Sequence, residues 1–216
     1  MSAPRLRYRT IEFGQTDIHV RTLRDTQQFS DDDGAALECG ISAANWPIFG
    51  VIWDSGRILA ELMFLHDVAG KRILEVGCGI ALASLVLNQR LADITATDYH
   101  PEVAGFLDVN VSLNNGRAIP FVRADWGGGE NGLGRFDLLI GSDILYEPVH
   151  VSLLAGFIER HAATRCDVVL VDPGRGHHAR FSKRMVSLGF SHSQNRPAPL
   201  ADLVHPFRGH VLRYNR

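Results

Sequence analysis

The fold is decided by the stretch Ile73-Leu74-Glu75-Val76-Gly77-Cys78-Gly79-Ile80-Ala81. Its short apolar opening is typical of a buried strand, which we expect over 73–77. The two glycines, one residue apart, let the backbone turn tightly and approach a ligand closely. A helical pattern follows near 81–91. The stretch therefore predicts the first strand, turn and helix of a parallel α/β sheet.

The same alternation continues along the chain. Apolar runs predict strands at 93–98, 119–124, 136–142 and 167–172, and amphipathic segments predict helices near 101–113, 148–163 and 177–188. Short strands that alternate with helices indicate βαβ units and a doubly wound, mostly parallel, Rossmann-like sheet. The last stretch, 203–214, has no helix before its end, so we expect it to form one or two closing strands.

The first fifty residues have a different pattern. Residues 5–29 alternate loosely around the turn Gly14-Gln15-Thr16-Asp17, which predicts a β-hairpin, and the acidic, Gly/Ala-rich residues 30–45 predict a loop. An apolar aromatic segment then leads into a helix near 55–66, which Asp54 or Ser55 can cap. We therefore divide the chain into an N-terminal hairpin and loop extension, 1–50, and a main domain, 51–216.

Composition limits the class of protein. With 216 residues, 45% of them hydrophobic, the chain fits one domain or one domain with an extension. The formal net charge of −2 does not favour nucleic acid or an anionic membrane, and no apolar run approaches the roughly 18 residues of a bilayer span. Three widely spaced cysteines, Cys39, Cys78 and Cys166, and a polar N-terminal start predict a reducing, cytoplasmic location.

Acidic residues stand where the first three predicted strands of the main domain end. In such sheets ligands bind at the carboxyl ends of the strands. Glu75 precedes the glycine turn, Asp98 ends the next strand, and Asp125-Trp126 follows the third. Asp98 can accept two ribose hydroxyls, Asp125 the adenine amine, and Trp126 can cover the ring. The sixth position of a dinucleotide loop would be glycine but is Leu82, so the pattern predicts a nucleoside site of another kind.

At these residues the sequence resembles the seven-strand S-adenosylmethionine-dependent methyltransferases. Within them it is most similar to the protein lysine methyltransferases that act on non-histone proteins, such as Hsp70-type chaperones, valosin-containing protein and the electron-transfer flavoprotein beta subunit. The resemblance covers roughly residues 46–190. Many relatives have a third glycine where Ala81 stands. The matching motifs are Val51-Ile52-Trp53-Asp54-Ser55-Gly56, the acid-x-Gly-x-Gly loop Glu75 to Gly79, Asp125-Trp126, Asp143-Ile144-Leu145-Tyr146 and Asp172-Pro173-Gly174-Arg175.

The resemblance implies a seven-stranded sheet, S-adenosyl-L-methionine as cofactor and catalytic roles for Asp143 and Tyr146. No metal is expected, because His177 and His178 lack a carboxylate or cysteine at ligand spacing. The residues expected at the cofactor are Trp53, Glu75, Gly77, Cys78, Gly79, Asp98, Tyr99, Asp125, Trp126 and Ser142.

The resemblance implies that Asp143 orients a substrate amine and that Tyr146 lines its channel. Each residue also has a structural interpretation, Asp143 as N-cap of the next helix and Tyr146 as a core aromatic beneath it. Arg175 could pair with an acidic substrate or with Asp172, while Asp172 followed by Pro-Gly also forms a good turn.

Several functions are therefore open. The first is a protein lysine methyltransferase, acting as a monomer on a protein substrate. The others are a small-molecule or protein-histidine methyltransferase, which has the same fold, and a non-catalytic S-adenosylmethionine-binding partner protein. A nucleic-acid methyltransferase is disfavoured because the segment 142–146 replaces the Asn-Pro-Pro-aromatic run of base amine methylation. The glycine pattern disfavours a nicotinamide-dependent oxidoreductase.

Overall fold

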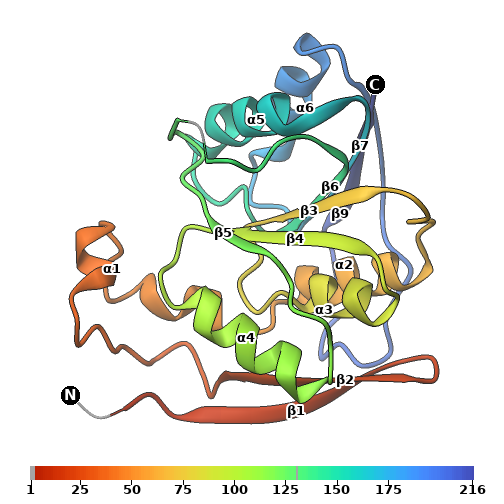
Figure 1. The fold of residues 1–216 in the computed structure, drawn as a ribbon. Coiled ribbons are helices and arrows are strands. Elements are labelled where there is room, and N and C mark those ends of the chain that lie inside the picture. The colour runs from red at the N-terminus through yellow and green to blue at the C-terminus, as the bar shows by residue number, and fades with distance from the viewer. Residues whose placement is uncertain (1–2, 130) are drawn as a thin grey trace.

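A seven-stranded sheet lies at the centre of the protein. The computed structural model describes residues 3–129 and 131–216, and within them the strand order is β5-β4-β3-β6-β7-β9-β8, with a separate two-stranded hairpin (Figure 1). The strands of the sheet are β3 (Arg72–Val76), β4 (Asp93–Asp98), β5 (Phe121–Arg123), β6 (Phe136–Ser142), β7 (Ala162–Asp172), β8 (Ser191–Asn195) and β9 (His210–Asn215). β3 to β7 are parallel, and β9 runs antiparallel between β7 and β8. This confirms the doubly wound, mostly parallel sheet.

The closing strands differ from the prediction for 203–214. Only its C-terminal part is a strand, β9, and the other strand, β8, lies earlier, at Ser191–Asn195. β8 has the sequence Ser-His-Ser-Gln-Asn and is exposed along its whole length at the edge of the sheet. An edge strand without buried side chains needs no apolar pattern, which is why its sequence gave no signal.

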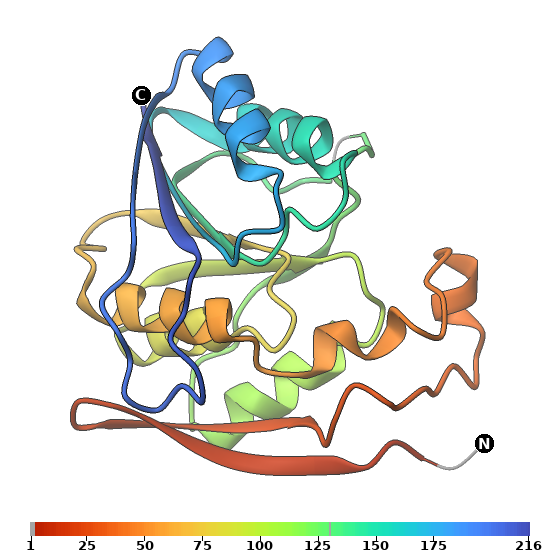
Figure 2. The same ribbon diagram turned by 180° about the vertical axis from the view of Figure 1, so that it is seen from behind.

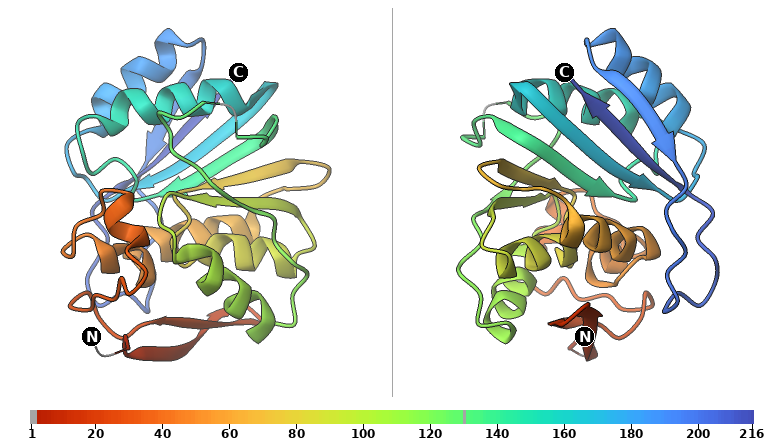
Figure 3. Two further views of the ribbon diagram at one scale, coloured as in Figure 1. Left: turned by 60° about the vertical axis from the view of Figure 1, so that its left-hand side comes forward. Right: turned by 90° about the vertical axis from the view of Figure 1, so that its right-hand side faces the viewer.

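Helices cover both faces of the sheet (Figure 3). On one face lie α2 (Asp54–Leu65), α3 (Leu82–Gln89) and α4 (Val103–Leu113), and on the other α5 (His150–His161) and α6 (His178–Ser187). Successive side chains of β3 alternate between them, with Ile73 in the core of the first face and Leu74 in that of the second. Among the described residues, no helix combines the length and apolar character that crossing a membrane requires.

The predicted N-terminal hairpin is present and docks on α4. β1 (Leu6–Phe13) pairs antiparallel with β2 (Thr16–Leu23). Asn110 Oδ1 accepts the backbone N–H of Arg21 at 2.7 Å, and Asn114 Oδ1 accepts that of His19 at 2.8 Å. The two asparagines thus satisfy backbone groups on the open edge of β2. Four hairpin side chains join the core of α2, α3 and α4: Phe13, Ile18, Val20 and Leu23.

The segment between the hairpin and α2 is more helical than predicted. Residues 30–45, expected to be a loop, contain the short helix α1 (Ala35–Glu38), and Trp46–Gly50 forms a 3₁₀ helix. Neither Asp54 nor Ser55 caps α2. Trp53 holds the N-cap position in extended backbone, and its carbonyl accepts the N–H of Arg57 at 3.0 Å, so Asp54 lies in the first turn. A carboxylate there is still favoured by the helix dipole.

Arg57 on α2 joins three separate parts of the chain. Its Nε donates to Asp202 at 2.9 Å, in the 196–209 loop that reaches down beside α2 (Figure 2). Its other nitrogens donate to Glu61 at 3.0 Å and to the carbonyl of Glu12 at 3.2 Å, and the guanidinium lies 4.3 Å from the ring centroid of Phe13. Arg57 therefore holds the hairpin and the long β8–β9 loop against the same helix.

We expect Arg57→Ala to lower the free energy of unfolding by about 2 kcal/mol. The partners Glu61 and Asp202 keep 31% and 53% of their side-chain surface exposed, so the loss comes from packing and hydrogen bonds rather than from stranded buried charges. Urea denaturation measures it. Arg165→Ala, at an exposed position on β7, should change stability by less than about 0.5 kcal/mol. Equal effects of the two substitutions would contradict this role for Arg57.

Candidate functional site

A cavity of about 500 Å³ opens where β3, β4, β5 and β6 end. This is the carboxyl edge of the sheet, at the point where the strand order reverses between β3 and β6, the place where ligands bind in such folds. The structure brings all the predicted site residues to its lining: Trp53, Glu75, Gly77, Cys78, Gly79, Asp98, Tyr99, Asp125, Trp126, Ser142, Asp143 and Tyr146.

The floor of the cavity is the glycine loop. Gly77 and Gly79 have φ of +63° and +50°, in the left-handed region that L side chains rarely adopt. A Cβ on Gly77 would lie 2.7 Å from Ile144 Cγ2, and one on Gly79 would lie 2.9 Å from the carbonyl oxygen of Phe49. Ala81 also has a left-handed backbone, with φ of 59°, at the N-cap of α3. The loop therefore holds its shape with alanine at the third position, as an open cradle lined by backbone.

Two carboxyl groups face this loop, that of the buried Glu75 and that of the half-buried Asp98. Asp98 Oδ2 accepts the N–H of Gly79 at 2.8 Å and Oδ1 accepts that of His100 at 2.9 Å, while burial raises the pKa of Asp98. Glu75 Oε2 accepts the N–H of Ser84 at 2.8 Å and also the Ser84 hydroxyl. Burial raises the pKa of Glu75 to about 7 against these hydrogen bonds. The pair forms an acidic, desolvated end of the cavity that favours cations and hydroxyl donors.

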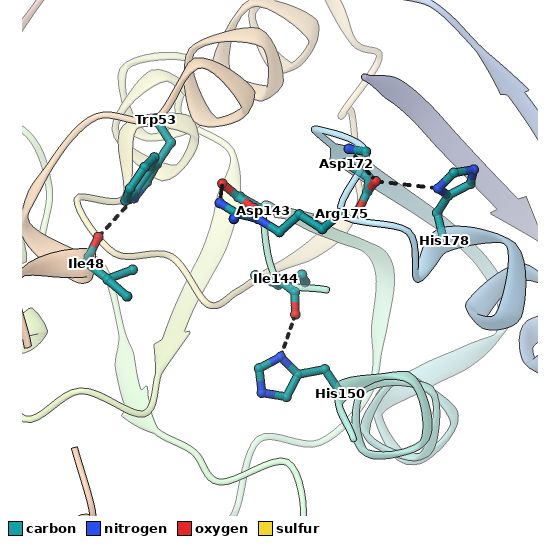
Figure 4. A network of polar contacts seen from close by, with 9 residues as sticks. Ile48, Trp53, Asp143, Ile144, His150, Asp172, Arg175 and His178 are labelled. Carbon is teal, nitrogen blue, oxygen red and sulfur yellow. Dashed lines mark hydrogen bonds and ion pairs between the residues drawn. The ribbon is translucent and has the colours of Figure 1, made fainter. Parts of the chain in front are cut away.

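The walls come from segments far apart in the sequence. Trp53 donates from Nε1 to the carbonyl of Ile48 at 2.9 Å (Figure 4). Tyr99 donates to the carbonyl of Cys39 at 2.9 Å, so part of the 39–53 segment closes one side. On the other side, the Trp126 and His150 rings meet edge to face at 5.2 Å between centroids. The sequence singled out neither His150 nor any individual residue of 39–49 as a site residue, because neither carries a motif.

Asp143 and Arg175 form a bidentate ion pair at the rim of the cavity (Figure 4). Arg175 Nε donates to Oδ1 at 2.5 Å and its terminal nitrogen to Oδ2 at 2.8 Å. Hydrogen bonding to Asp143 raises the pKa of Arg175. Asp143 has φ of 54°, and its N–H donates to the carbonyl of Val171 at 2.9 Å. The N-cap interpretation of Asp143 is wrong, because α5 begins at His150 with Val149 at the N-cap.

Tyr146 and Asp172 have different surroundings from each other. Tyr146 keeps 44% of its surface exposed and meets His150 edge to face at 4.4 Å, so it is not a core aromatic. Asp172 is buried, outside the lining of the cavity, and its Oδ1 accepts the N–H of Gly174 at 2.8 Å. The turn interpretation of Asp172 is therefore confirmed, and Arg175 pairs with Asp143 rather than with Asp172.

Comparison with known families gives a match over most of the chain. The model of a lysine methyltransferase family matches residues 33–185. This range begins after the hairpin and ends in α6, so it includes every residue that lines the cavity.

Curated relatives match the chain over shorter stretches. A protein N-lysine methyltransferase, METTL21A from Danio rerio, is 36% identical over 111 residues, which cover 46% of this chain and 49% of that protein. A histone-arginine methyltransferase, METTL23 from Rattus norvegicus, is 29% identical over 105 residues, 45% of this chain and 46% of that protein. The matched stretch thus spans about half the length of these relatives.

Solved structures share the fold. The magnesium protoporphyrin IX methyltransferase of Synechocystis PCC 6803, solved with bound S-adenosylmethionine, superposes with a TM-score of 0.57 at 20% identity, covering 74% of this chain and 76% of that one. At this identity the likeness concerns the architecture of the sheet and helices.

We expect Gly79→Ala to destabilise the fold. A left-handed backbone costs an L residue about 1–2 kcal/mol, and the new Cβ would press on the Phe49 carbonyl. Gly105→Ala, in α4 where an added Cβ meets nothing within 4 Å, should instead stabilise by about 0.5–1 kcal/mol. Thermal and urea unfolding of both variants measure the two signs. A neutral or stabilising Gly79→Ala would contradict the described loop.

We expect Glu75 to make stability fall as pH rises from about 5 to 8. The folded protein keeps a proton on Glu75 up to its pKa of about 7, whereas the unfolded chain releases it near the ordinary value of 4.5. The full effect amounts to about 3 kcal/mol, present below pH 4.5 and lost by about pH 7 to 8. Glu75→Gln should lack this part of the pH dependence.

Denaturation curves at pH 5 and pH 8 measure the Glu75 effect as a difference between variants. Glu159→Gln, an exposed acid on α5, is the matched control and should follow the parent protein. If Glu75→Gln and the parent protein lose the same stability between the two pH values, the raised pKa of Glu75 is wrong.

Proposed function

The chain belongs to the lysine methyltransferase family, and from that premise we propose that it transfers a methyl group from S-adenosylmethionine to a lysine side chain of a protein substrate. The observation that carries the proposal is one cavity with two chemically different ends. Its inner end holds the glycine loop with the buried Glu75 and the half-buried Asp98, and its rim holds Asp143 and Tyr146.

The inner end fits the parts of S-adenosylmethionine. The buried carboxyl of Glu75 suits the cationic methionine portion, and Asp98, held by two backbone N–H groups, suits the ribose hydroxyls. Asp125 would accept the adenine amine and Trp126 would cover the ring face. An added Cβ would clash with Ile144 at Gly77 and with the Phe49 carbonyl at Gly79, so the loop requires glycine at both positions. When bound, the cofactor supplies a methyl group on an activated sulfonium leaving group.

The rim residues would position the acceptor nitrogen. A lysine ammonium must lose its proton before it can act as a nucleophile, and burial in the cavity lowers its pKa. The Asp143 carboxylate raises the pKa of the ammonium, because it stabilises the positive charge. It also orients the amine by accepting a hydrogen bond from it. Tyr146 and His150 form an aromatic edge beside it. The chain thus contributes positioning and exclusion of water, which is what an already activated leaving group requires.

The relatives support a protein as the substrate. METTL21A is a lysine methyltransferase and METTL23 a histone-arginine methyltransferase, so both modify nitrogen atoms of protein side chains. Lysine as acceptor is supported by the family description and by the Asp143-x-x-Tyr146 motif. We further propose a monomeric cytoplasmic enzyme that does not act on nucleic acid or at a membrane, in keeping with its net charge of −2.

The test is methyl transfer from radiolabelled S-adenosylmethionine into proteins of an extract from the source organism. We expect a discrete labelled band, reduced by about two orders of magnitude or more in Asp143→Asn because orientation of the nucleophile is lost. Calorimetry should find cofactor affinity unchanged in that variant. Asp108→Asn, an exposed acid on α4, should label as the parent protein does.

Mass spectrometry of the labelled band then identifies the modified atom. A methylated lysine supports the proposal. A methylated arginine or histidine would contradict lysine as the acceptor but support a protein substrate. Label found only in small molecules would contradict the protein substrate. Cofactor binding without any labelled product would favour a non-catalytic partner protein.

A further inference from the structure

A second cavity, of about 580 Å³, adjoins the first. The two share Ile52, Trp53, Asp143 and Arg175 as lining residues. The second cavity continues outward between the start of α2 and the 196–209 loop, over Pro206, Phe207 and their neighbours. The Asp143–Arg175 ion pair is thus common to a cavity suited to the cofactor and to an outer groove. Figure 4 shows the charged ends of the two side chains together, on the side that faces Trp53.

The two members of the pair differ in their freedom to move. The Asp143 side chain is 9% exposed, whereas that of Arg175 is 42% exposed. The Asp143 N–H donates a hydrogen bond to the Val171 carbonyl, which fixes the Asp143 backbone at the edge of the parallel sheet. Arg175 stands between Gly174 and Gly176, both exposed and with φ of 100° and 89°. Arg175 can therefore return to water at modest cost, but Asp143 cannot be left without a cation.

We propose that Arg175 is a gate residue, whose guanidinium holds the place of the substrate's cationic side chain on Asp143. This inference rests on the proposed function. A substrate segment would lie in the second cavity, and its lysine ammonium would displace Arg175 and enter the first cavity. Only a cation can make this exchange, since a neutral side chain would strand the buried carboxylate. The gate thus selects a lysine or another cation before any chemistry takes place.

The same exchange points to the sequence of the substrate. Once the incoming lysine has taken Asp143, the second cavity is lined by the released Arg175 and by Arg208, with Asp54 as its other acid. His205 adds a further basic group when protonated. The net charge of these lining side chains is positive, and the side chains are exposed to solvent. The occupant it fits is a protein segment with an acidic residue next to the target lysine, so that the carboxylate takes the released guanidinium.

The gate is tested without cofactor or protein substrate, with n-butylammonium as a probe for the lysine side chain. Chemical-shift titration at constant ionic strength gives its affinity for the parent protein, Arg175→Ala and Arg180→Ala. We expect Arg175→Ala to bind it on the order of tenfold more tightly, because the competing guanidinium is gone. Arg180→Ala, at an exposed position on α6, should match the parent protein.

Two further variants keep the test decisive. Arg175→Lys, which retains a cation but not the planar fork, should bind the probe with an affinity between those of the parent protein and Arg175→Ala. The double variant Arg175→Ala with Asp143→Asn should not show the tighter binding of n-butylammonium. Equal affinity in the parent protein and the Arg175 variants overturns the gate. Because the titration contains no cofactor, a gate that behaves as expected beside a failed transfer assay would reject the proposed function alone.

A pair of peptides tests the acidic neighbour. Acetyl-Gly-Lys-Asp-Gly-amide should bind the parent protein several-fold more tightly than acetyl-Gly-Lys-Gly-Gly-amide, because its carboxylate meets the basic rim. Arg208→Ala should reduce that difference. The same affinity for both peptides in the parent protein would overturn this part of the inference.

Discussion

The carboxylate of Asp98 accepts the N–H of Gly79 at 2.8 Å, and the bond ties the end of β4 to the loop after β3. A carboxylate that is partly removed from water needs hydrogen-bond donors, and a glycine loop in left-handed conformation presents backbone N–H groups that have no strand or helix partner. The loop also needs space, which Phe49 limits from the other side. The edge of the sheet, the glycine loop and the 3₁₀ helix Trp46–Gly50 therefore depend on one another, and together they set the shape of the cavity.

The 3₁₀ helix Trp46–Gly50 is part of the site and not only a connection between the hairpin and α2. Trp46 and Phe49 meet edge to face at 5.4 Å between centroids, and Phe49 stacks at 4.1 Å on His100, which lies two residues after Asp98. Desolvation lowers the pKa of His100 to about 4, so its ring is neutral and apolar in character at physiological pH. This aromatic cluster gives the cavity a rigid wall, which a cofactor loop made largely of backbone could not supply by itself.

The Asp143–Arg175 pair combines two needs that conflict. A carboxylate that is to receive a cationic substrate must stay ionised and largely buried, yet a buried charge without a partner is costly. In the proposed gate, the ion pair with Arg175 removes this cost in the free protein and leaves only an exchange of cations when substrate arrives. Its position on a loop between two glycines keeps the exchange local, without movement of the sheet or of α5.

The sequence by itself determined the alternating strands and helices from β3 to α6 and the meeting of the end-of-strand acids. Apolar periodicity is a local property, and parallel strands bring their carboxyl ends to one edge, so Glu75, Asp98 and Asp125 had to converge. Only the tertiary structure decided that Arg175 pairs with Asp143, that the polar strand β8 closes the sheet, and that residues of the 39–49 stretch line the cavity. These features depend on contacts between distant segments, which leave no pattern in the local sequence.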